Sequence, residues 1–161
     1  MPLSQFIRSR TIFAWLCMAP IVVASDGEAA VRSAFDSEYR TELIQRVSGI
    51  PSSRDRLSFL WDQEKWVRSD SSIDIEARMK RLLSIGHVAL RSVGNPMDYA
   101  YLERLLDDIA ETSSNDLVRA DSLRMSGQCA YRTRRFDIAA SKYDAVLEIL
   151  RSHRGAPDGG G

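Results

Sequence analysis

The stretch that decides the fold is Ala120–Leu150, which reads ADSLRMSGQCAYRTRRFDIAASKYDAVLEIL. Its apolar residues recur three and four positions apart, the spacing of an amphipathic helix. Two antiparallel helices approach closely only where one of them offers glycine or alanine. We therefore expect Gly127 and Ala139 to form notches that Leu123 and Tyr143 fill. The stretch predicts a closely packed helical hairpin.

This hairpin resembles a tetratricopeptide repeat. The repeat has a large apolar residue, small residues three and four positions later, and an aromatic–Asp pair that opens its second helix. The chain departs from it at Ser126, where a larger apolar residue is usual, at Ala130, where an aromatic is usual, and in lacking a closing proline. The matching positions are Leu123, Ser126, Gly127, Ala130, Phe136, Asp137, Ala139, Tyr143 and Val146.

A weaker resemblance covers Met79–Ile109. Leu82, Ile85 and Ala89 match the first helix of a repeat. Gly86 stands at the repeat position that Gly127 has in the last hairpin. These two glycines are 41 residues apart, whereas the standard repeat is about 34 residues long. The region before residue 70 shows no convincing match.

The whole chain predicts an all-α protein. Helices are expected over about 26–48, 52–68, 74–93, 96–111, 116–132 and 136–152, since Gly, Pro and Ser/Asn/Asp caps separate the apolar periodic segments. They would form three antiparallel hairpins, about 26–68, 72–111 and 115–153. Each hairpin has an apolar face that only a neighbour can cover, so we expect a short stack. The resemblance implies a right-handed, tetratricopeptide-like solenoid.

The first 24 residues differ from the rest and predict a signal peptide. Arg8 and Arg10 precede an apolar run, Thr11–Ala24, which ends in a polar stretch. As a helix, the run would span roughly 21 Å, short of the ~30 Å needed to cross a membrane. We expect an exported protein, periplasmic or secreted, with a helical domain over 25–153 and a flexible glycine-rich tail over 154–161. The alternative is an uncleaved N-terminal membrane anchor.

Removal of a signal peptide would also remove Cys17 and leave Cys129 alone, so no internal disulfide is expected. Basic and acidic residues are equal in number, 22 each. A nucleic-acid-binding protein usually has a basic excess, so we do not expect DNA or RNA as a partner.

The resemblance implies a concave groove, lined by the first helix of each hairpin, that binds a peptide or a partner protein. Aligned cations there suit an acidic peptide or a terminal carboxylate, which arginine can hold with two hydrogen bonds. The alternative is that these side chains are ordinary solvated helix faces. The implied groove positions are Asp121, Arg124, Gln128, Tyr131 and Arg132 in the last hairpin, and Lys80, Leu83, His87, Leu90 and Arg91 in the weaker one.

The sequence predicts no catalytic motif, metal site or cofactor. The expected function is therefore an exported protein-interaction adaptor or scaffold. Two alternatives remain: a helical envelope enzyme or enzyme subunit using acidic residues in a cleft, and a structural subunit that self-associates through its apolar ends. Trp66 lies off the apolar line of its helix; we expect it to be buried, as large aromatics mostly are, with an exposed partner anchor as the alternative. The acidic pairs are Asp36 and Glu38, Asp62 and Glu64, and Asp107 and Asp108.

Overall fold

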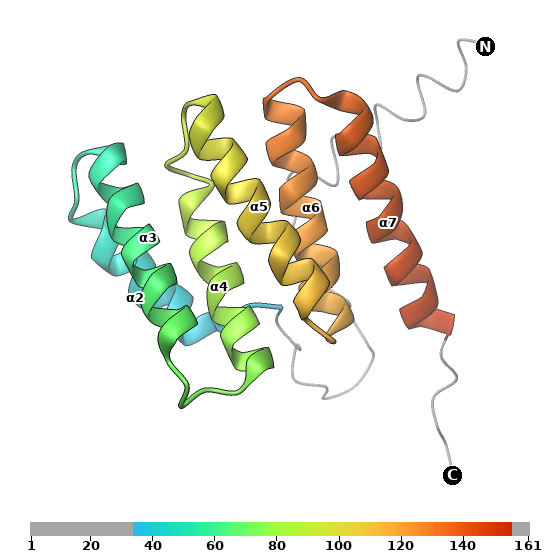
Figure 1. Cartoon of the computed structure of the whole chain (residues 1–161), viewed down its shortest axis with the longest axis horizontal. Helices are drawn as coiled ribbons and strands as arrows, with labels where there is room; N and C mark the ends of the chain where they lie inside the picture. Colours follow the sequence, from blue (N-terminus) through green and yellow to red (C-terminus); the bar gives the residue numbers. More distant parts are fainter. Residues whose placement is uncertain (1–33, 156–161) are drawn as a thin grey trace. The chain divides into compact units, whose positions relative to one another are not determined.

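The computed structural model describes residues 34–155. The expected signal peptide, the start of the first expected helix and most of the tail lie outside these residues. Within 34–155 the secondary structure is helical, with no strand, which confirms the all-α class (Figure 1). The helices are α2 (Ser37–Ser48), α3 (Ser53–Ser69), α4 (Ile75–Ala89), α5 (Pro96–Thr112), α6 (Asp116–Arg132) and α7 (Phe136–Gly155).

Polar caps fix where the helices begin. In each of α2 to α6 the residue before the helix accepts a hydrogen bond from a backbone amide of the first turn through its side-chain oxygen. Such a bond satisfies an amide that has no partner within the helix. Pro96 follows its cap at the first position of α5, where a missing amide hydrogen costs nothing. The capping residues are Asp36, Ser52, Asp74, Asn95 and Asn115.

Two expected helix boundaries are wrong. The first helix was expected from about residue 26, but Asp36 caps α2 and residues 34–36 are not helical. The third helix was expected to continue to Val93, but α4 ends at Ala89, where the amides of Ser92 and Val93 both donate to the Ala89 carbonyl. Phe35 and Val93 are nevertheless buried. Apolar periodicity therefore extended beyond the helices because the flanking turns also contribute to the core.

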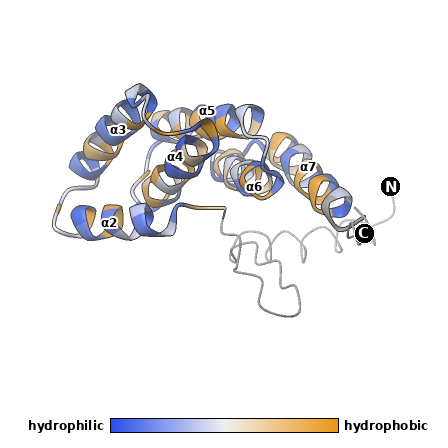
Figure 2. Cartoon of the chain, turned by 90° about the horizontal axis from the view of Figure 1, so that it is seen from below, coloured by the Kyte–Doolittle hydropathy of each residue, from blue (hydrophilic) through white to orange (hydrophobic). Residues whose placement is uncertain are grey.

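The helices pack mainly on their neighbours in the sequence. The most extensive contacts are those of α6 with α5 and α7, followed by those of α4 with α3 and α5. The helix α2 packs chiefly on α4, so it does not form with α3 the close hairpin expected over 26–68. Seen from below, α2, α4 and α6 lie along one side, and α3 and α5 along the other (Figure 2). This arrangement is consistent with a helical repeat.

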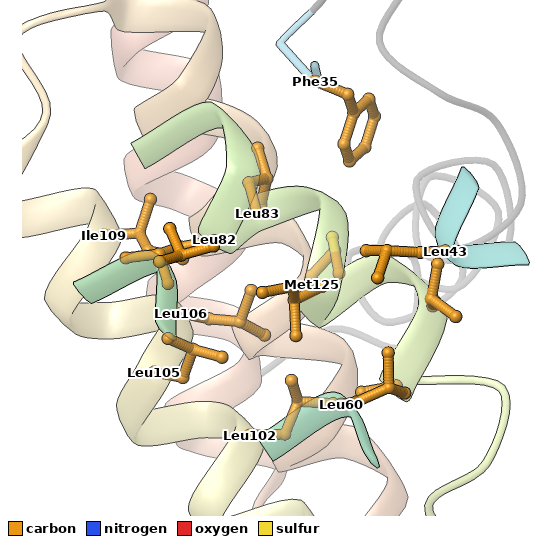
Figure 3. Packing of buried hydrophobic residues seen from close by; sticks show 14 of the residues in the cluster. Phe35, Leu43, Leu60, Leu82, Leu83, Leu102, Leu105, Leu106, Ile109 and Met125 are labelled. Carbon is orange, nitrogen blue, oxygen red and sulfur yellow. The ribbon is translucent and has the colours of Figure 1, made fainter. Parts of the chain in front are cut away.

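The core is built from leucines and isoleucines of several helices (Figure 3). Leu60 of α3, Leu82 of α4, Leu106 of α5 and Met125 of α6 are fully buried. Burial of a side chain of this size stabilises the fold by about 1.5–3 kcal/mol.

Within residues 34–155, no helix combines the length and the apolar character needed to cross a membrane.

Candidate functional site

The residues implied by the repeat resemblance do not form one open surface. They lie on α4, on α6 and in the turn that follows α4, but their exposure differs. Arg91, Tyr131 and Arg132 are exposed; Lys80, His87, Leu90 and Gln128 are half-buried; Leu83, Asp121 and Arg124 are buried. Only part of the expected groove is therefore available to a partner.

Asp121 and Arg124 are paired with each other in the interior. Arg124 Nε donates to Asp121 Oδ1 over 2.6 Å, and the two side chains are one turn apart on α6. Both are more than nine-tenths buried. Removal of either one would leave a buried charge uncompensated, so the pair must persist while the fold is intact. Neither side chain is presented to solvent as an open groove residue.

The segment before α2 covers part of α4. The ring of Phe35 lies 5.0 Å from the ring of His87, centroid to centroid. The Asp36 carboxylate pairs with Arg81 over 3.2 Å, and the hydroxyl of Ser84 donates to the Asp36 carbonyl over 3.2 Å. One face of His87 is thus occupied by the chain's own residues.

His87 lies within a cluster of positive charge. Burial, together with the nearby guanidinium groups of Arg40, Arg91 and Arg124, lowers the pKa of His87 to about 4. Arg40 comes from α2, Arg91 from the α4–α5 turn and Arg124 from α6. The guanidinium of Arg40 also lies over the Phe35 ring, 4.8 Å from its centroid. We call Arg40, His87, Arg91 and Arg124 the basic cluster.

Carboxylates balance this cluster only in part. Arg124 is paired with Asp121, as described above. Within residues 34–155, neither Arg40 nor Arg91 forms a salt bridge. The cluster therefore offers uncompensated positive charge next to a neutral imidazole.

Arg40 is the residue that sequence reasoning missed. It belongs to the region without a repeat match, so the resemblance assigned it no position in the groove. It reaches the cluster because α2 packs on α4. No local pattern connects Arg40 with His87, which is 47 residues further along the chain.

A second polar cluster joins α5, α6 and α7. Lys142 Nζ lies 2.5 Å and 2.7 Å from the two carboxylate oxygens of Asp107, and 2.7 Å from the hydroxyl of Ser126. A lysine beside a serine can activate a nucleophile in an open site. Here the Ser126 side chain is fully buried and its hydroxyl donates to Asp107 over 2.6 Å. These contacts hold three helices together.

A cleft of about 300 Å³ lies between α3 and α5. Its one buried carboxylate, Glu64, accepts hydrogen bonds from Arg68 Nε over 2.8 Å and from the Tyr101 hydroxyl over 2.7 Å. Burial and the bond to Glu64 raise the pKa of Tyr101 to about 12. Arg68 also pairs with Asp108 over 2.8 Å. Two carboxylates that share acid–base work need environments that move their pKa values apart. Here Glu64 and Asp108 bind the same Arg68 guanidinium, and Asp108 is about half exposed.

Trp66 is 52% exposed, so the expectation that it is buried is wrong. It falls on the solvent side of α3, whereas Trp61 packs against the ring of Tyr101, 4.5 Å away.

Among the described residues, no group of three or more His, Cys, Asp or Glu side chains is arranged to hold a metal ion.

No protein-family model, curated protein or solved structure matches this chain.

Proposed function

We propose that this protein is a helical-repeat adaptor that binds an acidic segment of a partner protein at the basic cluster. The observation that carries the proposal is the convergence of Arg40 and Arg91 near His87 without a salt-bridge partner among the described residues. Unpaired cations attract an oppositely charged partner and disfavour a like-charged one. Arginine adds a planar donor group that can hold a carboxylate with two hydrogen bonds.

The proposed surface differs from the one implied by the repeat resemblance. Arg40 is added, because α2 brings it to α4. Asp121 and Arg124 are removed as direct contacts because they bind each other in the interior. Arg91 stays as the exposed cation of the surface, whereas Lys80 and Gln128 are half-buried.

Interhelical polar contacts support a rigid surface. Glu76 at the start of α4 accepts from the Ser113 hydroxyl over 2.7 Å and from the Ser114 amide over 2.6 Å, which ties α4 to the α5–α6 turn. Lys142 ties α5 and α6 to α7 in the same way. A preorganised surface loses less conformational freedom on binding, and this favours affinity.

The test is titration of a fluorescent acidic peptide, such as oligoglutamate, into the full chain and the Arg40→Glu/Arg91→Glu variant. We expect the double reversal to weaken binding by about tenfold or more, because both cations become repulsive. The matched control is Arg151→Glu, an exposed charge reversal on α7. Far-UV circular dichroism checks that helicity is retained. Equal affinity in the parent and the double variant would rule out the basic cluster as the binding surface.

We further propose that the adaptor acts outside the cytoplasm, since residues 8–24 have the charge and length of a signal peptide. N-terminal sequencing of the exported product tests this. A product that begins near residue 25 would support export with cleavage, whereas one that begins at Met1 would favour the anchor.

A further inference from the structure

The α4–α5 and α6–α7 turns lie at the same end of the helical stack (Figure 1). Exposed apolar side chains gather in and next to these turns. Met97 is 81% exposed at the start of α5, and Phe136 is 54% exposed at the start of α7. The Phe136 ring contacts the exposed ring of Tyr131 edge-on, at 5.4 Å between centroids. Large apolar groups exposed at one end of the stack favour an interaction surface there.

The same turns carry the positive charge. The α6–α7 turn contributes Arg134 and Arg135, of which Arg135 is paired with Glu103, and the α4–α5 turn contributes Arg91. Neither turn contains an acidic residue; the nearest acids, Asp98 and Asp137, lie in the first turns of α5 and α7. Within residues 34–155, Arg132 and Arg134 form no salt bridge. Both are exposed. We call Met97, Tyr131, Arg132, Arg134 and Phe136 the turn edge.

The turns at the opposite end of the stack carry no basic residue. The α3–α4 turn, residues 70–74, contains Asp70 and Asp74 and no basic residue. The α5–α6 turn, residues 113–115, contains no charged residue. The two ends of the stack therefore differ in charge, although basic and acidic residues are equal in number over the whole chain.

The backbone between α6 and α7 forms a closed turn. Arg134 has φ 62°, the left-handed conformation that non-glycine residues seldom adopt. Its amide donates to the Tyr131 carbonyl, and the Arg135 amide donates to the Ala130 carbonyl, so the turn is closed by its own hydrogen bonds. The exposed side chains thus project from a firmly held turn.

From this combination we infer that the turn edge binds the surface of an anionic phospholipid bilayer. Exposed aromatic and methionine side chains next to arginines suit the headgroup region, where rings enter the interface and guanidinium groups contact phosphates. Anionic lipid attracts the turn edge and repels the acidic α3–α4 turn at the other end. The exposed apolar side chains and the arginines lie at one end of the stack, so both can meet one lipid surface at the same time. This activity is separate from the proposed binding of an acidic segment.

The test is cosedimentation of the full chain with vesicles of phosphatidylcholine, with or without phosphatidylglycerol. Arg132→Gln/Arg134→Asn removes the two charges, and asparagine tolerates the left-handed backbone of position 134. Met97→Ser/Phe136→Ser removes the apolar groups. We expect each double variant to bind phosphatidylglycerol vesicles about tenfold more weakly than the parent.

The control for the apolar pair is Trp66→Ser/Ile75→Ser, which removes two side chains that are 52% and 54% exposed at the opposite end. Arg151→Gln is the control for lost charge. All variants retain the apolar run Thr11–Ala24, so differences between them report on the turn edge. Arg40→Glu, which should weaken peptide binding, should leave vesicle binding unchanged, and this separates the two proposals.

A direct readout is quenching by brominated lipid. A Phe136→Trp variant should show additional quenched tryptophan fluorescence relative to the parent when brominated phosphatidylglycerol is present. Equal vesicle binding by the parent and the turn-edge variants would overturn the inference. Equal binding of the parent to vesicles with and without anionic lipid would also overturn it. So would turn-edge variants that lose binding to acidic peptide but not to vesicles.

Discussion

Gly127 on α6 lies against the ring of Tyr143 on α7: a Cβ atom at position 127 would be 3.1 Å from Tyr143 Cε1. Tyr143 is almost fully buried, so its ring has little room to move away. This contact confirms the expected notch at Gly127. Gly86 has a similar role on α4, where a Cβ would be 3.0 Å from Leu106 Cδ2 of α5.

A larger residue at position 127 should push α6 and α7 apart. We expect Gly127→Val to lower the free energy of unfolding by about 1–3 kcal/mol through overpacking against Tyr143. Urea denaturation followed by circular dichroism measures the change. The control is Gly94→Ala, because no atom lies within 4 Å of a Cβ there. A Gly127→Val protein as stable as the parent would show that the helices do not need this close approach.

Lys142 should be important for stability because it contacts three polar groups in a mostly buried position. Lys142→Met removes the cation and leaves the carboxylates of Asp107 and Glu103 without it. We expect the free energy of unfolding to fall by about 1–3 kcal/mol, less than for a fully buried pair, because Asp107 is partly exposed and Glu103 keeps Arg135. Lys65→Met, which breaks the exposed pair with Asp62, should cost less than about 1 kcal/mol. Equal losses in the two variants would contradict the prediction.

Stability should fall in mild acid because of His87. Its pKa is lowered from 6.5 to about 4 in the folded chain, so the unfolded chain takes up the proton first. The folded state is therefore destabilised as pH drops from about 6.5 towards 4, and no further below that. Allowing for solvent screening, we expect a loss of about 1 kcal/mol near pH 5. The loss should be smaller in His87→Gln, measured by urea denaturation at pH 7 and pH 5. An unchanged pH dependence in that variant would contradict the assignment.

Cys129 should resist alkylation in the folded protein. Its side chain is fully buried, and burial, followed by the Glu103 carboxylate, raises the pKa of the thiol to about 12. The reactive thiolate is therefore scarce at neutral pH. In a Cys17→Ser background, mass spectrometry should show alkylation in urea and almost none in native buffer. Rapid native labelling would mean that α6 opens readily.

The helices were largely predictable because their boundaries depend on nearby residues. The expected range 116–132 agrees with α6, and the Asn95 cap with Pro96 after it marks the start of α5. The wrong boundaries arose at residues 34–36 and 90–93, where apolar residues of turns pack into the core and imitate helical periodicity. The expected surface was less predictable, since the repeat register identifies a side of the helix but not what covers it.

The sequence by itself determined the all-α class, most helix boundaries and the notch at Gly127, because caps, turns and small residues act over a few positions. Only the tertiary structure decided that Asp121 and Arg124 bind each other in the interior, that Trp66 faces solvent, and that Arg40 joins His87. The physical reason is that the burial and the charge environment of a side chain depend on helices far apart in the chain. No local sequence pattern predicts that α2 packs on α4.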